Sequence, residues 1–134
     1  MTTSTPLSAK TVPALKAKAF TKRQLPSVVK TAVQAAQDKK AGGITVIDLR
    51  TASSFTDFFI IMTGMNSRQT AALADAVERE LKAQNLKPIG VEGVSRGEWI
   101  LIDYGSFIVH VFSPAARDYY ALEKLWGDAP RLTV

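Results

Sequence analysis

Two mainly apolar runs stand on either side of a polar Asp-Tyr-Gly-Ser segment in residues 98–112, E-W-I-L-I-D-Y-G-S-F-I-V-H-V-F, as in two β-strands joined by a tight turn. Gly105 stands in the second loop position, where a two-residue turn requires a positive φ. With Tyr104 and Gly105 as the loop, Trp99 is predicted to face His110 across a β-hairpin. The rest of the chain is predicted to be organised around this hairpin.

The two faces of the predicted hairpin differ in polarity, because successive side chains of a strand point to opposite sides. One face is wholly apolar and is predicted to lie on the core: Ile100, Ile102, Phe107, Val109 and Val111. The other face is mixed: Trp99, Leu101, Asp103, Ile108, His110 and Phe112. We expect the mixed face to be partly hydrated and open to a partner. A shift of one residue in register would exchange the two faces.

The other apolar patterns complete an α/β domain in the order α-β-β-α-β-β-β-α. Helices are predicted over residues 26–41, 67–84 and 114–126, and strands over residues 44–49, 58–63, 88–92, 99–103 and 106–112. Strand 58–63 is apolar on both faces, which favours the middle of the sheet, whereas Pro88 favours an edge position for strand 88–92. The prediction is a single domain with a mixed sheet of about five strands and helices packed on it.

The last predicted helix begins at Ser113, a capping residue followed by a proline at the first helical position. Its large apolar residues are expected to form core and rim rather than a ligand site: Tyr119, Tyr120, Leu122, Leu125 and Trp126. Arg117 has three candidate partners, which are Asp103, Asp118 and the edge of the sheet.

Charge is divided unevenly along the chain, whose formal net charge is +5. Residues 1–40 hold eight basic side chains and one acid, whereas residues 41–134 hold 9 basic and 11 acidic side chains. Residues 1–24 contain no acid and are rich in Ser, Thr, Lys, Ala and Pro, a composition typical of a flexible basic arm. The arm could also tether RNA or act as an organelle transit peptide. The domain, residues 25–134, is expected to meet a basic protein rather than a phosphate backbone.

Composition excludes several classes of protein and site. The absence of cysteine excludes disulfides and thiolate metal sites, and it fits a reducing compartment. No apolar run approaches the roughly 18 residues of a membrane span, and the N-terminus lacks the apolar segment of a secretory signal. His110 is the only histidine, so no metal site with two imidazoles can form. We expect a soluble, cytoplasmic protein without metal or cofactor.

Catalytic motifs are missing from the sequence. There is no G-x-S-x-G elbow and no glycine-rich phosphate loop, and no D-x-D or D-x-E pair is present to hold the magnesium ions of nucleotidyl transfer. Residues 64–67 precede a helix and could hold an anion at its N-terminus. His110 is expected to be a strand histidine packed against Trp99, or an interface contact, rather than a catalytic residue.

A recognition pattern is present instead. Trp99 and Asp103 lie on the same predicted face, and Glu92 is a short turn away. An aromatic anchor beside acids is typical of an interface that receives Lys or Arg from a partner. The alternative is that Trp99 is a core residue and the acids are merely solvated.

Six motifs, in this order, closely resemble the ribosomal silencing factor family, which is also called RsfS, iojap or YbeB. They are T-D-F-F-I-I-M-T-G at 56–64, S-R-Q at 67–69, V-E-G at 91–93, W-I-L-I-D-Y-G at 99–105, V-H-V-F at 109–112 and R-D-Y-Y-A-L-E-K-L-W at 117–126. The resemblance covers roughly residues 25–128, and it is the combination of motifs that is specific.

The resemblance implies a nucleotidyltransferase-like fold without transferase activity. It also implies binding to the large ribosomal subunit at its L-fourteen-type protein, so that the small subunit cannot join and translation is repressed when nutrients are short. The contact surface of the family would correspond to Glu92, Trp99, Asp103, Tyr104 and His110, on or near the mixed face. The arm, residues 1–24, lies outside the family pattern and could contact ribosomal RNA.

Two other functions stay open from the sequence. One is an enzyme with a nucleotidyltransferase-like fold, and the other is an RNA-binding module that acts through the basic arm. The apolar members of the mixed face also predict a homodimer of the free protein: Leu101, Ile108 and Phe112.

Overall fold

Two neighbouring strands at the centre of the sheet are buried on both of their faces. The computed structural model describes residues 20–134. In it, β2 (Phe58–Thr63) and β5 (Phe107–Phe112) pair in parallel, and every residue of the two strands except Thr63 is buried. Neither face of the sheet can therefore be left open to water at its centre. The prediction that strand 58–63 is central is confirmed.

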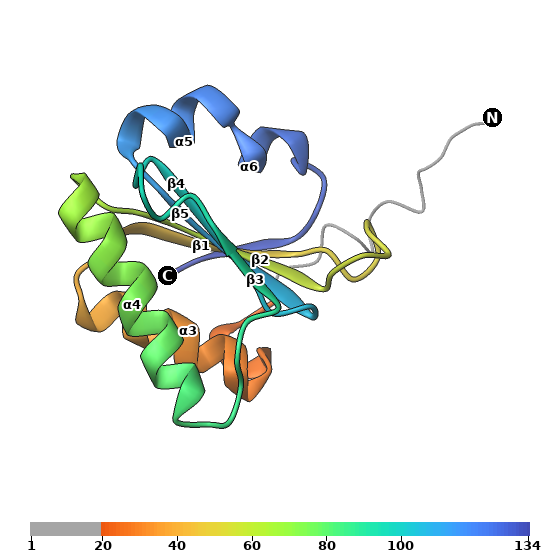
Figure 1. The fold of residues 1–134 in the computed structure, drawn as a ribbon. Coiled ribbons are helices and arrows are strands. Elements are labelled where there is room, and N and C mark those ends of the chain that lie inside the picture. The colour runs from red at the N-terminus through yellow and green to blue at the C-terminus, as the bar shows by residue number, and fades with distance from the viewer. Residues whose placement is uncertain (1–19) are drawn as a thin grey trace.

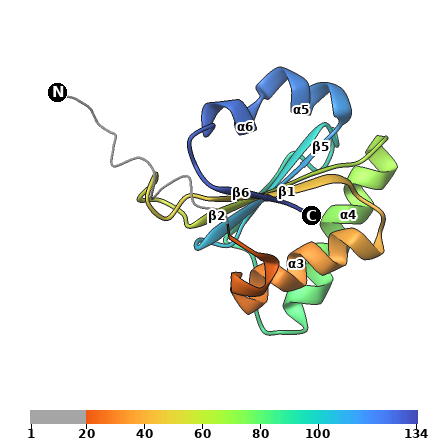
Figure 2. The same ribbon diagram turned by 180° about the vertical axis from the view of Figure 1, so that it is seen from behind.

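The sheet of the described residues has six strands in the order β3-β4-β5-β2-β1-β6. Figure 2 shows β6 beside β1. The four strands outside the central pair are β1 (Gly42–Asp48), β3 (Gly90–Glu92), β4 (Trp99–Asp103) and β6 (Arg131–Thr133). The β2–β5 pair is parallel and the other pairs are antiparallel, so the sheet is mixed, as predicted. β3 occupies an edge, also as predicted.

Helices cover both faces of the sheet (Figure 1). A 3-10 turn (η1, Lys22–Gln24) leads into α3 (Ser27–Asp38), which packs with α4 (Ser67–Lys82) on one face. α5 (Pro114–Tyr120) and α6 (Leu122–Leu125) lie on the other. Each face of the sheet thus has its own apolar cluster beneath its pair of helices.

Local signals in the sequence account for the helices. α3 and α4 bury apolar side chains at helical spacing: Val29, Ala32, Val33 and Ala36 in α3, and Leu73, Val77 and Leu81 in α4. At the start of α4, the Asn66 side chain accepts a hydrogen bond from the backbone N–H of Gln69 at 2.9 Å. At the start of α5, the Ser113 side chain accepts one from the N–H of Ala116 at 3.1 Å. The cap predicted at Ser113 is confirmed.

The predicted hairpin forms, but its register is wrong by two residues. Trp99 lies opposite Phe112 rather than opposite His110. The turn is displaced by one residue: the backbone N–H of Tyr104 donates to the carbonyl oxygen of Phe107 at 3.0 Å, so the two residues of the loop are Gly105 and Ser106 and not Tyr104 and Gly105. A shift of two residues keeps every side chain on its predicted face, because the side-chain period of a strand is two. The apolar face accordingly lies on the core under α3 and α4.

The expectation that the mixed face is partly hydrated is confirmed for β4 and wrong for β5. α5 and α6 cover most of it, and Ile108, His110 and Phe112 are buried. Only Trp99, Leu101 and Asp103 of that face stay partly exposed. Ile108 and Phe112, which were expected to contact a second copy of the chain, are therefore not available for that contact. The isolated polar residues of this face suggested hydration, whereas its apolar residues decided the packing.

The C-terminal segment differs from the prediction in two respects. The single helix predicted over residues 114–126 is broken at Ala121, which adopts a left-handed conformation (φ 47°, ψ 47°) between α5 and α6. The chain then returns as β6, which pairs with β1 and raises the predicted five strands to six. Three residues are too few for alternation of polarity to reveal a strand.

The last residues of the predicted basic arm pack on the domain. Phe20 contacts the cluster under α3 and α4, and the backbone N–H of Thr21 donates to Oε1 of Gln24 at 2.8 Å. The rest of the predicted arm, residues 1–19, lies outside the described residues. No helix of residues 20–134 is long and apolar enough to cross a membrane.

The backbone of Ala121 suggests a first prediction. A left-handed conformation costs a residue with a Cβ about 1 kcal/mol, so Ala121→Gly should raise the free energy of unfolding by about 0.5–1 kcal/mol. Urea denaturation followed by circular dichroism measures the change. The control Ala72→Gly, at an exposed position of α4, should lower the same quantity by about 1 kcal/mol. Equal losses from both substitutions would contradict the prediction.

Candidate partner-binding surface

Three aromatic side chains meet where β4 begins and α5 ends. The rings of Trp99 and Tyr120 lie 4.5 Å apart between centroids, and those of Tyr120 and Tyr119 lie 5.0 Å apart. Tyr119 is 81% exposed and Tyr120 is 48% exposed, whereas Trp99 is only partly exposed. We call these three residues the aromatic patch. Its members come from segments about 20 residues apart in the sequence, and the packing of α5 on the sheet joins them.

Two buried residues, His110 and Phe112, hold Trp99 in one orientation. Its Nε1–H donates a hydrogen bond to Nδ1 of His110 at 3.0 Å, and its ring packs against Phe112 with 5.0 Å between centroids. Because the indole N–H can only donate, the Nδ1 atom that accepts it carries no proton. The indole therefore has a fixed edge inside the protein and a free edge at the surface.

His110 lies beneath the surface and not on it, since only 3% of the residue is exposed. Burial lowers the pKa of His110 from 6.5 to about 4, so the imidazole is neutral near pH 7. Its proton is on Nε2, which has no hydrogen-bond partner in the described residues and lies in a cluster that includes the ring of Phe59, 4.4 Å away between centroids. The prediction that His110 packs against Trp99 is confirmed.

Two acids lie on the same face of the sheet as Trp99. Asp103 is partly exposed at the end of β4, and its Oδ1 accepts a hydrogen bond from the backbone N–H of Gly105 at 2.8 Å. Glu92 is exposed on β3 opposite Leu101, which puts both side chains on one side of the sheet. Neither acid forms an ion pair within residues 20–134. Their charges are therefore available to a basic partner.

Tyr104 lies on the opposite side of the sheet, and the expectation that it is on or near the mixed face is wrong. It is buried in the cluster under α3 and α4, with its ring stacked on that of Phe107 at 4.9 Å between centroids. Burial, and then the charge of Glu78, raise the pKa of Tyr104 to about 12. The reason is alternation along the strand: Tyr104 follows Asp103 and so points the other way.

The structure thus brings together Glu92, Trp99 and Asp103, supports Trp99 through His110, and separates Tyr104 from them. It adds Tyr119 and Tyr120, which were expected in core and rim. Two consecutive tyrosines in a helix cannot both face the sheet, because neighbouring positions are about 100° apart. That spacing was the signal available in the sequence for an exposed aromatic side chain.

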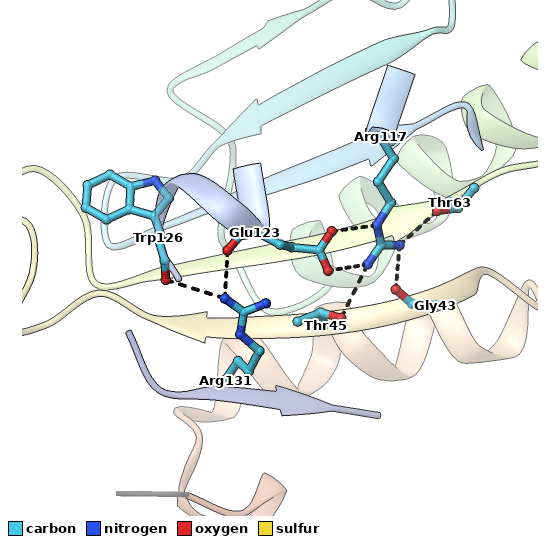
Figure 3. A network of polar contacts seen from close by, with 7 residues as sticks. All are labelled: Gly43, Thr45, Thr63, Arg117, Glu123, Trp126 and Arg131. Atoms are coloured by element: carbon cyan, nitrogen blue, oxygen red, sulfur yellow. Dashed lines mark hydrogen bonds and ion pairs between the residues drawn. The ribbon is translucent and has the colours of Figure 1, made fainter. Parts of the chain in front are cut away.

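Arg117 fastens α5 and α6 to the sheet (Figure 3). Its guanidinium donates to the carbonyl oxygen of Gly43 at 2.6 Å and to Oγ1 of Thr63 at 2.8 Å. It also donates to both carboxylate oxygens of Glu123, each at 2.9 Å, and these bonds lower the pKa of Glu123. The carbonyl oxygen of Glu123 in turn accepts from Arg131 of β6.

The prediction that Arg117 pairs with Asp103 or Asp118 is wrong, because its partners are Glu123, Gly43 and Thr63. The guanidinium crosses from α5 to β1 and β2 and closes on α6. Because α5 carries Tyr120, this network also holds Tyr120 against Trp99. The contacts of Arg117 with the sheet, at Thr63 and Gly43, lie 54 and 74 residues away along the chain, which is too far for a local sequence pattern to reveal the network.

The arrangement is suited to binding more than to chemistry. No three His, Asp or Glu side chains of the described residues are placed to hold a metal ion. At residues 64–67, where an anion was considered, the N–H groups of Met65 and Gln69 already donate to side chains of Gln69 and Asn66. What the surface offers is a fixed aromatic patch beside two unpaired carboxylates.

Comparisons with known proteins show what this chain resembles. Residues 22–134 match the family described as "Ribosomal silencing factor during starvation". A protein of Halalkalibacterium halodurans named ribosomal silencing factor RsfS is 39% identical over 103 residues, which are 77% of this chain and 88% of that protein. A mouse protein named mitochondrial assembly of ribosomal large subunit protein 1 is 30% identical over 93 residues, 67% of this chain and 41% of that one.

A solved structure has the same fold. It is the crystal structure of a protein from Chromobacterium violaceum, with a TM-score of 0.73 and 41% sequence identity over 75% of this chain and 83% of that one. The mixed sheet with helices on both faces is therefore an arrangement that related chains adopt.

The Arg117 network yields a prediction about stability. Arg117→Met removes a guanidinium whose side chain is only 15% exposed and leaves the Glu123 carboxylate unpaired, so we expect the free energy of unfolding to fall by about 2–3 kcal/mol. The control Arg50→Met removes an ion pair with Asp48 in which the Arg50 side chain is 55% exposed, and it should cost less than about 1 kcal/mol. Urea denaturation compares them, and equal costs would disprove the special role of Arg117.

His110 yields a prediction about pH. Its pKa is about 4 in the folded protein, against 6.5 for an unperturbed imidazole, so its neutral form contributes stability above pH 6.5 that is lost as the pH falls toward 4. Between pH 7 and pH 5 the free energy of unfolding should fall by about 2 kcal/mol from this group alone. His110→Leu should abolish that part of the pH dependence, while costing about 1–3 kcal/mol at pH 7 because the Trp99 N–H loses its acceptor.

Urea denaturation at a series of pH values between 7 and 5 measures both effects. Above pH 5 most carboxyl groups stay ionised, so the comparison of the two proteins isolates the imidazole. Identical pH dependence in the original protein and in His110→Leu would contradict the assignment.

Proposed function

Because this chain belongs to the ribosomal silencing factor family, we propose that it binds the large ribosomal subunit and prevents the small subunit from joining. The effect would be to repress translation in the cytoplasm. The partner that we propose on the large subunit is its L-fourteen-type protein. This mechanism is steric and requires no catalysis by the chain.

The observation that carries the proposal is the position of the aromatic patch beside Asp103 and Glu92. Aromatic rings that are already held in place lose little conformational entropy when a partner covers them. Trp99 would be the anchor, and the two carboxylates would receive Lys or Arg side chains of a basic ribosomal protein. Residues 41–134, which carry a net charge of −2, suit such a partner.

The five residues proposed for the contact would have two kinds of role. Glu92, Trp99 and Asp103 would touch the partner, as would Tyr119 and Tyr120. His110 and Tyr104 are buried and would act from inside, His110 by orienting Trp99 and Tyr104 by holding the turn that follows Asp103. In this way, a change at either buried residue would alter binding without any direct contact.

Steric occlusion relates the size of the effect to the occupancy of the large subunit. A folded chain of 14.5 kDa need only occupy space that the other subunit requires. Its effect should therefore follow the fraction of large subunits that are occupied, which depends on affinity and on concentration. The basic arm, residues 1–24, is proposed to add contacts with ribosomal RNA phosphates.

Substitutions of Asp103 and Glu92, the two acids beside the aromatic patch, test the proposed partner surface. Asp103→Asn removes a charge but keeps an oxygen to accept from Gly105, and Glu92→Lys reverses an exposed charge. Together they should weaken binding to large subunits about 10- to 100-fold, because carboxylates that pair with a basic partner would be lost. A matched control, Asp128→Asn with Glu80→Lys, changes net charge equally at exposed positions outside α3 and outside the proposed partner surface and should leave binding within about twofold.

Sucrose-gradient sedimentation of large subunits, with and without small subunits, measures both binding and joining. Saturating amounts of the original protein should shift joined ribosomes to free subunits, and the Glu92/Asp103 variant should shift fewer. Normal joining at saturating protein would reject the proposed function. A variant and a control with equal affinities would reject the proposed surface while leaving the function intact.

A further inference from the structure

We propose that the chain has a second interaction surface, formed by α3 with its flanking residues and the first turn of α4, which binds the phosphate backbone of RNA. We call it the basic surface and define it by its six cations: Lys22, Arg23, Lys30, Lys39, Lys40 and Arg68. All six residues are exposed or partly exposed. It lies on the helical layer opposite the one that carries Tyr119 and Tyr120 (Figures 1 and 2).

Contacts between segments gather these cations. Nζ of Lys22 lies 3.4 Å from Oε1 of Gln37, so the segment before α3 folds back along that helix. Gln37 and Lys30 are seven residues apart and share one stripe of the helix. Lys22 and Lys30 therefore lie on one side of α3, which ends at Lys39.

The start of α4 extends the same surface. The Nε2 atom of Gln69 donates to the carbonyl oxygens of Lys39 and Lys40 at 3.4 and 3.3 Å. These bonds bring the first turn of α4, with Arg68, beside the end of α3. The positive end of the α4 dipole adds to the field there. Beyond this turn, α4 alternates acids and bases, so we place the limit of the surface at its first turn.

Within residues 20–134, no acid forms an ion pair with a cation of the basic surface. The described residues form three ion pairs, Arg50–Asp48, Arg79–Asp75 and Arg117–Glu123, and none of them includes a cation of this surface. Asp38 is the only acid of residues 20–40. Residues 1–19 contain no acid either and add three lysines to the chain that leads into it. Phosphate is the anion that such a group of unpaired cations would attract.

The kind of partner follows from what the surface lacks. Within residues 20–134, α3 has no large apolar side chain that is exposed. Of the exposed large apolar residues, Met65 is the one nearest in sequence to the first turn of α4. Protein interfaces depend on buried aromatic and apolar anchors, as the aromatic patch supplies. Contacts with phosphates depend only on cations and polar groups. The aromatic side is therefore suited to a protein and the basic surface to RNA.

The two helical layers also differ in net charge. Residues 20–40 and 67–82, with α3 and α4, carry eight bases and four acids, whereas residues 88–134, with the hairpin, α5 and α6, carry four bases and six acids. A chain with this division of charge can contact a basic protein with its acidic side and RNA with its basic side. Neither contact then brings like charges together. The inference rests on this division and stands whether or not subunit joining is affected.

The test uses the full chain and a fluorescently labelled single-stranded RNA of mixed sequence. Binding is followed by fluorescence anisotropy at several KCl concentrations. The variant is Lys39→Glu with Lys40→Asn; asparagine is chosen because Lys40 has a φ of 59°, which Asn tolerates. The control, Lys124→Glu with Arg50→Asn, removes the same charge from exposed positions outside the basic surface.

We expect the variant to bind RNA at least about tenfold more weakly than the control, and its slope of log affinity against log salt to be smaller by about 1.4, which corresponds to two lost phosphate contacts. Circular dichroism and thermal unfolding verify that both proteins are folded. Equal losses in variant and control would overturn the proposal, because net charge alone would then explain binding.

Two further results would also overturn it. One is loss of RNA affinity only when the three lysines of residues 1–19 are replaced by glutamate in the full chain, which would assign binding to the arm. The other is competition by polyglutamate as strong, per charge, as competition by RNA, which would make the surface a site for acidic protein. Binding to the L-fourteen-type protein is measured on the same variant, and it should not change.

Discussion

β2 and β5 place apolar side chains on both faces of the sheet at its centre, and the other elements are arranged to keep water from them. α3 and α4 cover one face, which a pair of ordinary amphipathic helices can do. The other face is covered by α5 and α6, which are seven and four residues long. Such short helices bury little area, and Arg117 compensates by bonding them to β1 and β2.

The same requirement shapes the candidate surface. Because α5 ends over the start of β4, Tyr120 lies against Trp99, and the indole is partly covered rather than free. His110, buried beneath, is kept neutral and accepts the indole N–H. A side chain that must bind a partner is thereby preorganised by groups that also form the core. The basic surface lies on the other helical layer, which leaves the two proposed partners to separate sides of one sheet.

Much of the fold could be predicted because it depends on local rules. Strand 58–63, the caps at Asn66 and Ser113 and the two faces of the hairpin follow from periodicity and from side-chain chemistry over a few residues. The predicted register of the hairpin was wrong by two residues, but the assignment of side chains to its two faces was still correct, since a shift of two residues preserves the faces. The candidate site was predicted in part: Trp99, Asp103 and Glu92 share a face, whereas Tyr104 does not.

The sequence by itself determined the types of most elements, the apolar and mixed faces of the hairpin and the division of charge, because each depends on neighbours in the chain. Only the tertiary structure decided which face met water. Ile108, His110 and Phe112 are buried because α5 and α6, held by Arg117 through contacts up to 74 residues away, fold over them. The break at Ala121, which turns α6 toward the sheet, and the meeting of Tyr120 with Trp99 depend on that same packing, which no local pattern encodes.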